Sequence, residues 1–314
     1  MTVSIIIRAR NEADSIGKVL QGITNQVFDG QIETLLVDTA STDGTPEIAR
    51  QFGCRVLPIT PETFTWGYAL NYGASQSTGD ILINLSAHAI PADPYWLAHL
   101  IAPFLNDDRV AGVFGRQLAS THGDPFEAVE LDLWFPDWPE PRRSNSFSNA
   151  NGALRRSVWG KMPFDEHVMI GEDSVWAKKV SDLGYHTVYQ PLSRVYHNHD
   201  LEVSGKESTN SIFIRWYWRS YTMPLFNTHY RGARLKYVLR QYLTYGKYDF
   251  KHLIKHRLLK QIFKIPIYEF IRQYASWRGA RDYANGYKPN APTWRGCYFS
   301  PKPPAFIRLL GIFL

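Results

Sequence analysis

The stretch VDTASTDGT, from Val37 to Thr45, follows directly on an apolar run that begins near Glu33. A short apolar run bounded by turn residues predicts a buried strand, here one that ends at Asp38. In an open α/β sheet, ligands bind in the crevice outside the carboxyl ends of the parallel strands. Asp38 is therefore expected to lie at a ligand-binding edge of a sheet.

Strand-like and helix-like patterns alternate on both sides of this stretch. Apolar runs predict strands over residues 3–8, 33–38, 54–57, 80–85, 110–114, 149–154 and 187–189. Helical spacing predicts helices over 13–26, 46–52, 66–77, 94–105 and 172–183, with Thr45 as N-cap and Pro46 as first residue of the second helix. Such alternation predicts an α/β fold, with a mainly parallel central sheet covered by helices on both faces.

Two later segments break this pattern. Residues 131–147, LDLWFPDWPEPRRSNSF, hold three prolines and two tryptophans, so we expect a surface loop or lid that does not continue the sheet. From Ile212 onward, aromatic and aliphatic residues alternate with Lys and Arg at helical spacing, interrupted at Pro224, Pro266 and Pro289. We therefore predict a catalytic or binding domain over residues 1–211 and a basic, aromatic-rich helical region over 212–314.

Charge is distributed unevenly along the 314 residues. From His229 onward there are 17 Lys and Arg against three acids, a formal charge of +14, whereas the preceding residues carry 18 against 26, a formal charge of −8. A basic tail of this kind favours an anionic partner, either phospholipid headgroups or nucleic acid. Two cysteines and no apolar stretch of membrane-spanning length predict a cytoplasmic location, peripheral to the inner face of the cell membrane if the tail binds lipid.

Six motifs in a fixed order carry a family resemblance. They are SIIIRARNE, VDTASTDGT, ALNYGASQSTGDILINLSAHAIPAD, NANGALRRSVW, GEDSVWAKKV and VYHNHD, and together they span about two thirds of the chain. This order resembles glycosyltransferase family 2, inverting enzymes with an A-type nucleotide-sugar fold, and is most similar to the bacterial rhamnosyltransferase-like branch. The resemblance implies transfer of a sugar, with rhamnose as one candidate, from a UDP- or dTDP-linked donor to a saccharide or lipid-linked acceptor in surface polysaccharide synthesis.

The resemblance implies a donor site around Asp38. In the family this aspartate contacts the nucleotide base or ribose, and a carboxylate suits the ring N–H of uracil or thymine as a hydrogen-bond acceptor. A capping role in the turn before Thr45 is the alternative, although Ser41, Thr42 and Asp43 already offer turn chemistry. Further donor-binding candidates are Arg8, Asn11, Glu12 and Asn71, with packing or solvent exposure as the alternative for Asn11 and Glu12 and local hydrogen bonding as the alternative for Asn71.

The metal motif of the family is altered. Where relatives carry Asp-x-Asp for a divalent cation on the diphosphate, this chain has Ser86, Ala87 and His88. Imidazole suits Mn²⁺ better than Mg²⁺, so the expected cation is Mn²⁺. His88 either ligates the cation, donates a proton to the diphosphate or fills space. His197 and His199 alternate in an extended segment and are further metal candidates, with a pair of hydrogen-bonded loop histidines as the alternative.

The acid pair Glu172 and Asp173 begins a predicted helix. The resemblance implies that Asp173 removes the proton from the acceptor hydroxyl as the hydroxyl attacks the anomeric carbon, and that Glu172 orients the acceptor. The alternative is that both acids only stabilise the N-terminus of their own helix.

Acceptor or sugar contacts are expected from two further groups of residues. Tryptophans of the proline-rich segment would either stack on sugar rings or be buried against the protein. The NANG motif would form the floor of the sugar pocket, because its glycine permits close backbone approach. These residues are Trp134, Trp138, Asn149, Asn151 and Gly152.

Two other classes of function remain open at this stage. A non-catalytic module that binds nucleotide sugars or glycans would explain the missing metal aspartates, but the retained Glu172 and Asp173 disfavour it. A nucleic-acid-binding protein would explain the basic tail, but the acidic body and the lack of a recognition motif disfavour nucleic acid as a partner. For the tail itself, anionic membrane and a helical subdomain that covers the core are both open.

Overall fold

The computed structural model describes residues 1–119, 125–168, 170–197, 209–225, 227, 230, 232–286, 304, 305 and 307. The chain divides into two compact units. The first, which we call the sheet unit, comprises residues 1–121, 131–168 and 172–199. The second, the helical unit, comprises residues 122–130, 169–171 and 200–314.

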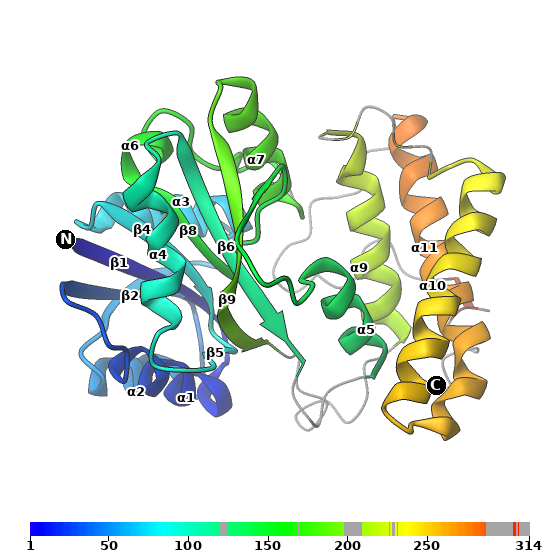
Figure 1. Ribbon diagram of the computed structural model, residues 1–314, viewed down its shortest axis with the longest axis horizontal. Helices are drawn as coiled ribbons and strands as arrows, with labels where there is room; N and C mark the ends of the chain where they lie inside the picture. The colour runs from blue at the N-terminus through cyan, green and yellow to red at the C-terminus, as the bar shows by residue number, and fades with distance from the viewer. Residues whose placement is uncertain are drawn as a thin grey trace. The chain divides into compact units, whose positions relative to one another are not determined.

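A nine-stranded sheet forms the sheet unit (Figure 1). Its strands are β1 (Thr2–Ala9), β2 (Gln31–Thr39), β3 (Arg55–Ile59), β4 (Ile81–Ser86), β5 (Ala89–Pro91), β6 (Val110–Leu118), β7 (Arg142–Ser144), β8 (Asn151–Arg155) and β9 (His186–His197). The order is β3-β2-β1-β4-β8-β6-β9-β5, with β7 paired to β9. Strands β1, β2, β3, β4, β6 and β9 share one direction, and β5, β7 and β8 oppose it. The predicted mainly parallel α/β sheet is thus confirmed.

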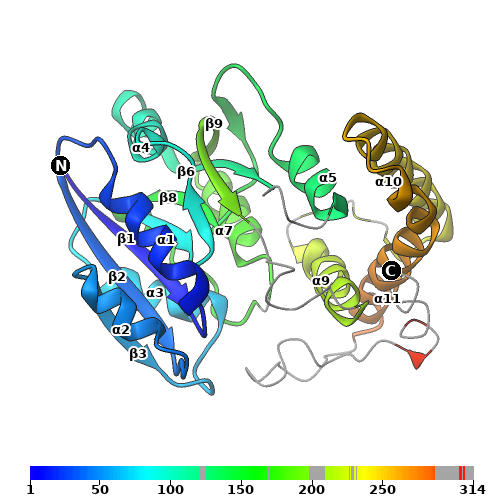
Figure 2. The same ribbon diagram turned by 90° about the horizontal axis from the view of Figure 1, so that it is seen from below.

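Helices lie on both faces of this sheet (Figures 1 and 2). They are α1 (Ala13–Thr24), α2 (Thr45–Gln51), α3 (Trp66–Gln76), α4 (Trp96–Asn106), α6 (Arg156–Trp159) and α7 (Glu172–Asp182). Buried side chains of α1 and α4 pack on the face that carries Val3, Ile5 and Ile7, because alternate residues of a strand point to the same side. Gly73 of α3 lies against Ile6 on the other face, so closely that an added Cβ would come within 2.5 Å of the Ile6 side chain.

Two expectations about individual elements are wrong. The N-cap of α2 is Gly44 with φ 91°, a left-handed conformation that glycine adopts without strain, and Thr45 is already helical. The 131–147 segment is not a continuous loop, because the helix α5 (Pro125–Trp134) runs into it and β7 adds its Arg142–Ser144 backbone to β9. None of the three prolines of this segment falls within β7, so its N–H groups stay available for pairing.

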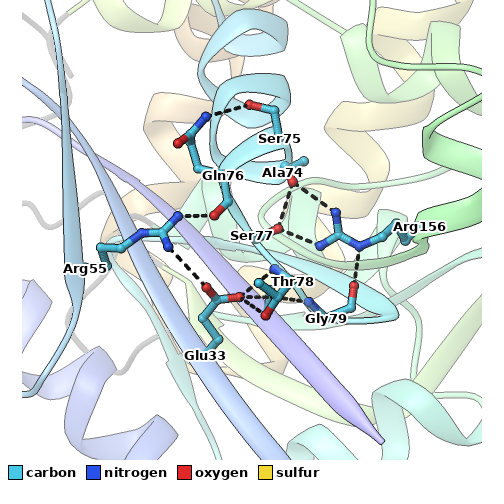
Figure 3. Close-up of polar contacts among 10 residues, drawn as sticks. Glu33, Arg55, Ala74, Ser75, Gln76, Ser77, Thr78, Gly79 and Arg156 are labelled. Carbon is cyan, nitrogen blue, oxygen red and sulfur yellow. Dashed lines mark hydrogen bonds and ion pairs between the residues drawn. The ribbon is translucent and has the colours of Figure 1, made fainter.

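A polar network fixes the end of the sheet where β1 and β2 begin (Figure 3). The Glu33 carboxylate accepts hydrogen bonds from Ser4 Oγ at 2.7 Å and from Thr78 N at 2.8 Å. The Arg156 guanidinium donates to the Ala74 carbonyl at 3.2 Å, to Ser77 Oγ at 2.8 Å and to the Gly79 carbonyl. These groups satisfy one another, which indicates a structural role for this edge.

The helical unit is built from α9 (Thr209–Thr222), α10 (Leu235–Lys255) and α11 (Ile265–Ala284), with the start of α5 and the short 3₁₀ helices η1 (Met223–Leu225) and η2 (Leu259–Lys264). The predicted helical C-terminal region is therefore present. Pro224 lies in η1, Pro266 occupies the first turn of α11, and Pro289 is outside the described residues. Within the described part of the chain, we find no helix that is both long and apolar enough to span a bilayer.

Candidate active site

Asp38 lies near the carboxyl end of β2, beside Ala9 at the end of β1. Its side chain is buried, and one carboxylate oxygen, Oδ2, accepts a hydrogen bond from the Ser41 N–H at 3.1 Å. The other oxygen, Oδ1, is also buried and has no hydrogen-bond partner among the described residues. A buried, unpaired acceptor is unfavourable unless something else donates to it. Asp38 therefore combines a turn contact with an oxygen that fits a ligand donor.

The loop that follows Asp38 is tied to the loop that follows β1. The Asn11 N–H donates to Ser41 Oγ at 2.9 Å, and Asn11 Oδ1 accepts from the Thr42 N–H at 2.9 Å. Asp43 accepts from the Ala13 N–H at 2.9 Å. Asn11 holds a positive φ of 54°, which its short polar side chain tolerates. Asn11 and Asp43 thus hold together the two loops beside Asp38, and the Asn11 side-chain oxygen is already used within the protein.

His88 lies between two oxygen-bearing side chains. Its Nδ1 is 3.1 Å from Glu12 Oε1, and its Nε2 is 3.0 Å from Ser86 Oγ. The ring of His197 stacks on it with the centroids 4.9 Å apart and the planes 8° from parallel, because β5 and β9 pair Ala89 with His197. The loop after β1, the end of β4 and the end of β9 thus meet at His88. Ala87 is 1% exposed and adds only a methyl group to the core.

The donor set around His88 fits a cation only in part. A carboxylate that holds one imidazole nitrogen is the usual partner of a metal-ligating histidine, and Glu12 has this relation to His88. However, no group of three or more His, Cys, Asp and Glu side chains among the described residues is arranged to hold a metal ion. His88 and His197 would supply at most two ligands, so a cation here would need oxygen atoms from a bound diphosphate. His199 lies outside the described residues.

A charged cluster forms where Arg8, near the end of β1, meets Glu172 and Asp173 at the start of α7. Arg8 Nη1 is 3.8 Å from Glu172 Oε1, and the guanidinium carbon lies 4.6 Å from the ring centroid of Trp66 at the start of α3. Arg8 Nη1 is buried without a hydrogen-bond acceptor among the described residues. Burial lowers the pKa of Arg8, although the negative charges of Glu172 and Asp173 oppose this shift. The arginine can still offer an N–H group to an anion.

The Asp173 carboxyl has an unusual proton affinity. Burial and the neighbouring Glu172 carboxylate raise its pKa to about 7, while hydrogen bonds from the backbone N–H groups of Ser174 and Asn149 and the charge of Arg8 act in the opposite direction. The bond from Ser174 N to Asp173 Oδ1 is 2.7 Å long. A carboxyl group with a pKa near neutrality is suited to general base catalysis.

Two asparagines form a chain of hydrogen bonds that ends at Glu172. Asn84 of β4 donates to Asn149 Oδ1 at 2.8 Å, and Asn149 donates to Glu172 Oε1 at 3.0 Å. Asn84 Oδ1 is buried without a partner among the residues that the structure describes. Asn84 was missed as a site residue, although a polar side chain inside the buried strand ILINLS is a signal that was available. Asn149 thus contacts the acid pair, and its place in the floor of a sugar pocket stays a prediction.

Three predicted site residues are occupied within the protein. The Asn71 Nδ2 group donates hydrogen bonds to Phe164 O and Glu166 Oε1, both at 2.9 Å. Its Oδ1 accepts from Trp159 Nε1 at 3.0 Å and from the Phe164 N–H at 3.1 Å. Asn151 is 0% exposed, accepts from Trp96 Nε1 at 2.8 Å and donates to Ser193 O at 3.1 Å. Gly152 faces Phe147 and Ser148 so closely that a Cβ would come within 2.4 Å of the Ser148 carbonyl. These contacts agree with the local hydrogen-bonding alternative for Asn71, and the assignment of Asn151 and Gly152 to a sugar pocket stays a prediction.

The two tryptophans differ in exposure. Trp138 is 37% exposed, packs edge-on against Tyr189 at 5.6 Å and carries the Arg142 guanidinium 4.4 Å from its ring centroid. Trp134 ends α5 and is partly buried. Trp138 thus retains a surface that a sugar ring can contact, and its role as an acceptor residue stays a prediction, as does that of Trp134.

The retained candidates share one edge of the sheet. The order β2-β1-β4 places the ends of these strands side by side, and Arg8 of β1 pairs with Ser86 of β4. From β1 the chain passes to β2 and β3 on one side of β1, and then returns to β4 on the other side. The point where the strand order reverses in this way is the switch point at which open α/β sheets bind ligands. The row of strand ends β2, β1 and β4 therefore carries Asp38, Arg8 with the acid pair, and His88 with Glu12. The Asp38 and Arg8 side chains leave opposite faces of the sheet, because Asp38 pairs with Ala9 and successive residues of a strand alternate. This fold is of the α/β type that binds ligands at the carboxyl ends of its parallel strands.

Residues 4–155, just under half of the chain, match the family model described as Glycosyl transferase family 2. The resemblance inferred from the six motifs is thereby confirmed. Glycosyltransferase AglE of Haloferax volcanii is 31% identical over 195 residues, which cover 58% of this chain and 62% of the relative. The O-antigen chain rhamnosyltransferase WbaN of Salmonella anatum is 28% identical over 180 residues, which cover 54% of this chain and 57% of the relative. The match to WbaN agrees with the predicted similarity to rhamnosyltransferases.

The match spans about three fifths of the length of these curated relatives. Among solved structures, the fold is similar to that of the mannosyltransferase PcManGT from Pyrobaculum calidifontis in complex with GDP-Man and Mn²⁺. The TM-score is 0.59 at 19% identity, with 91% of this chain and 88% of that chain covered. This likeness confirms the A-type glycosyltransferase fold.

Proposed function

We propose that this protein is an inverting glycosyltransferase that moves a sugar from a nucleotide diphosphate donor to a hydroxyl group of a saccharide or lipid-linked acceptor. The observation that carries the proposal is the row of groups at the carboxyl edge of β2, β1 and β4. Asp38, with its buried acceptor oxygen, lies within the residues that match the family 2 model, and Asp173, whose carboxyl has a pKa of about 7, follows them in the same sheet unit.

In this proposal Asp38 binds the nucleotide, and Arg8 and the His88 group bind the diphosphate. Asp38 Oδ1 accepts a hydrogen bond from the nucleotide, which satisfies the atom that the protein leaves unpaired. We assign the negative charge of the diphosphate to Arg8 and to the His88 group, which belong to β1 and to the turn after β4, the strands that follow β2 in the sheet. Donors aimed at the leaving group stabilise the charge that develops on it during transfer.

Asp173 acts as the base. Its carboxylate takes the proton from the acceptor hydroxyl while the hydroxyl oxygen forms a bond to the anomeric carbon. The bond from that carbon to the diphosphate oxygen breaks at the same time, and the nucleoside diphosphate leaves from the opposite face, so the configuration inverts. Glu172 stays paired with Arg8 and Asn149 and orients the base.

In this proposal a divalent cation, with Mn²⁺ favoured over Mg²⁺, would bind at the His88 group together with the diphosphate. His88 and His197 would hold it, with Glu12 fixing the His88 ring, and the ion would neutralise charge on the leaving group. Mn²⁺ accompanies GDP-Man in PcManGT, which has a similar fold. His88→Ala should weaken donor binding measured by isothermal titration in the presence of Mn²⁺, whereas unchanged affinity and turnover would remove His88 from the site.

Candidate donors are UDP- and dTDP-linked sugars, and dTDP-rhamnose is the first to test because WbaN is a rhamnosyltransferase. A lipid-linked acceptor of a bacterial surface polysaccharide would explain a basic C-terminal region near a membrane at the cytoplasmic side.

A screen of nucleotide sugars by thermal shift, with Mn²⁺, Mg²⁺ or a chelator, tests the donor. A bound donor raises the melting temperature by mass action. Release of nucleoside diphosphate is then measured with the selected donor. Binding without any release of nucleoside diphosphate, by water or by any of a panel of saccharide acceptors, would instead support a non-catalytic module that binds nucleotide sugars.

A further inference from the structure

One exposed side of α10 carries two neighbouring rows of residues. Leu239, Leu243, Phe250 and Ile254 are 56%, 71%, 46% and 47% exposed. At about 100° per residue these four side chains fall within about 60° of one another around the helix. They form a continuous apolar row, which we call the apolar row of α10.

A basic row lies directly beside it. On the same projection of about 100° per residue, the basic side chains cover about the next 100° of the helix surface. They are Lys236, Arg240, Lys247, Lys251 and Lys255, and all five are exposed. Asp249 and Leu253, both 0% exposed, lie outside these two rows on the helix surface, and α10 packs against α11. The helix thus presents a half-apolar, half-basic surface to solvent.

The same composition continues past the end of α10. Leu258 and Leu259 are 38% and 59% exposed, and Phe263 of η2 is 85% exposed. Arg257, Lys260 and Lys264 alternate with them. From Arg234 to Lys264 there are nine Lys and Arg residues and one acid, Asp249, which is buried. This segment therefore offers cationic and apolar groups together without an exposed carboxylate.

We propose that this surface docks on an anionic phospholipid bilayer, with α10 lying in the plane of the interface. Large apolar side chains beside a row of lysines and arginines are the arrangement that inserts into the boundary between headgroups and acyl chains while the cations meet anionic headgroups. Long Lys and Arg side chains also keep their charged ends in water when their stems lie against apolar material.

Charge separates this occupant from two others. A second copy of the chain docked through the apolar row would bring two basic rows close together, and like charges repel. A nucleic acid would engage the basic row but leave four large apolar side chains in water. An anionic bilayer satisfies both rows at once. The proposal is independent of the sugar-transfer reaction, since it depends only on the surface of α10 and η2.

Flotation of the full-length protein with defined vesicles tests the proposal. The vesicles contain either phosphatidylcholine alone or equal parts of phosphatidylcholine and phosphatidylglycerol. The protein is expected to float with the anionic vesicles, to remain unbound with the neutral ones and to lose binding as salt is raised. Binding of equal strength to both, or no binding to the anionic vesicles, would overturn the proposal.

Two double variants separate the rows. Leu239→Gln with Leu243→Gln, and Lys247→Gln with Lys251→Gln, should each lower the bound fraction about tenfold or more, since both rows contribute. Leu105→Gln is the matched control, because Leu105 is 63% exposed on α4 of the sheet unit, and it should bind like the wild type. Circular dichroism verifies that the variants keep their helices.

Sedimentation and an oligonucleotide distinguish the other occupants. If the leucine variant converts a dimer to a monomer and leaves vesicle binding unchanged, the apolar row is an interface between copies of the chain. If the lysine variant loses oligonucleotide binding while vesicle binding persists, the basic row serves nucleic acid. Either result contradicts the bilayer proposal.

Discussion

An arginine surrounded by acids occurs in both units, but the surroundings differ. In the helical unit, Arg272 is 0% exposed and pairs with Glu130 at 2.8 Å, with Asp249 at 3.6 Å and with Glu269. Aromatic rings of Trp216, Tyr245 and Tyr268 enclose it, with centroids 4.8 to 5.2 Å from the guanidinium carbon. In the sheet unit, Arg8 has one acidic partner at 3.8 Å, and its Nη1 atom has no hydrogen-bond acceptor among the described residues.

This difference separates structural from functional charge. The Arg272 cluster has three acids for one cation, and burial together with the neighbouring Asp249 raises the pKa of Glu269 to about 9. Glu269 therefore keeps its proton at neutral pH, so Arg272 faces two carboxylates, Glu130 and Asp249, instead of three. Each arginine keeps a buried nitrogen without a hydrogen-bond partner among the described residues, Nη1 in Arg8 and Nε in Arg272, but Arg8 lies at the edge of the sheet beside a carboxyl that titrates near pH 7. Unsatisfied polar groups at the switch point of a sheet are those that a ligand would complete.

The largest expected effect on activity comes from Asp173→Asn. Loss of a general base lowers the transfer rate by about 10² to 10⁴-fold. Because the amide keeps the size of the carboxyl, donor affinity measured by titration calorimetry should stay close to that of the wild type. Unchanged turnover would show that Asp173 is only a residue of the helix N-terminus.

Arg272→Met should have the largest effect on stability. Removal of one partner from a buried charge cluster leaves the other charges uncompensated and costs about 3 to 5 kcal/mol of the free energy of unfolding. Urea denaturation measures the change. Arg240→Met on the exposed side of α10 is the control, with a change within about 0.5 kcal/mol. Equal losses from the two variants would show that the Arg272 cluster contributes little.

Asp38→Asn sharpens the comparison at the donor end. A hydrogen bond to a charged group contributes about 1.5 to 3 kcal/mol, so donor affinity should fall about 10 to 100-fold. Asp43→Asn is the matched control in the same loop, since both oxygens of the Asp43 carboxylate accept hydrogen bonds within the protein, from the N–H groups of Ala13 and Thr45. The Asp43 variant should lower the melting temperature with a smaller effect on donor affinity. The reverse pattern would place the nucleotide on Asp43.

The pH dependence should show the smallest effect. Since Asp173 acts as a base with a pKa of about 7, kcat/KM should rise with pH and level off above that value. For stability the sign is opposite, because the folded state holds the Asp173 proton up to about pH 7 whereas the unfolded state releases it near about pH 4. The free energy of unfolding should therefore decrease across this interval, and Asp173→Asn should remove that part of the slope. A slope that survives the substitution would assign the titration to another group.

Part of the site followed from local sequence alone. Asp38 comes at the end of an apolar strand and Asp173 at the start of a helix, and both positions follow from local periodicity and capping. The strands of the parallel half were predicted for the same reason. The short strands β5 and β7 were missed, because three residues are too few to show a period and their pairing with β9 depends on distant residues.

Other residues could not be assigned without the tertiary structure. Asn71, Asn84, Asn149 and Asn151 have the same side chain, and their spacing in the sequence does not separate them. Asn71 and Asn151 are saturated by contacts within the protein, whereas Asn84 and Asn149 lead to Glu172. What an amide does depends on which donors and acceptors the fold brings within about 3 Å of it.

The amino-acid sequence by itself determined the α/β class, the family and the candidate base, because apolar periodicity and ordered motifs are local properties of the chain. Only the tertiary structure decided that Asp38 keeps an unpaired buried oxygen, that Glu12 holds His88, and which side of α10 faces solvent. Burial, pairing and proton affinity arise from residues that are distant in sequence and become neighbours only when the chain folds.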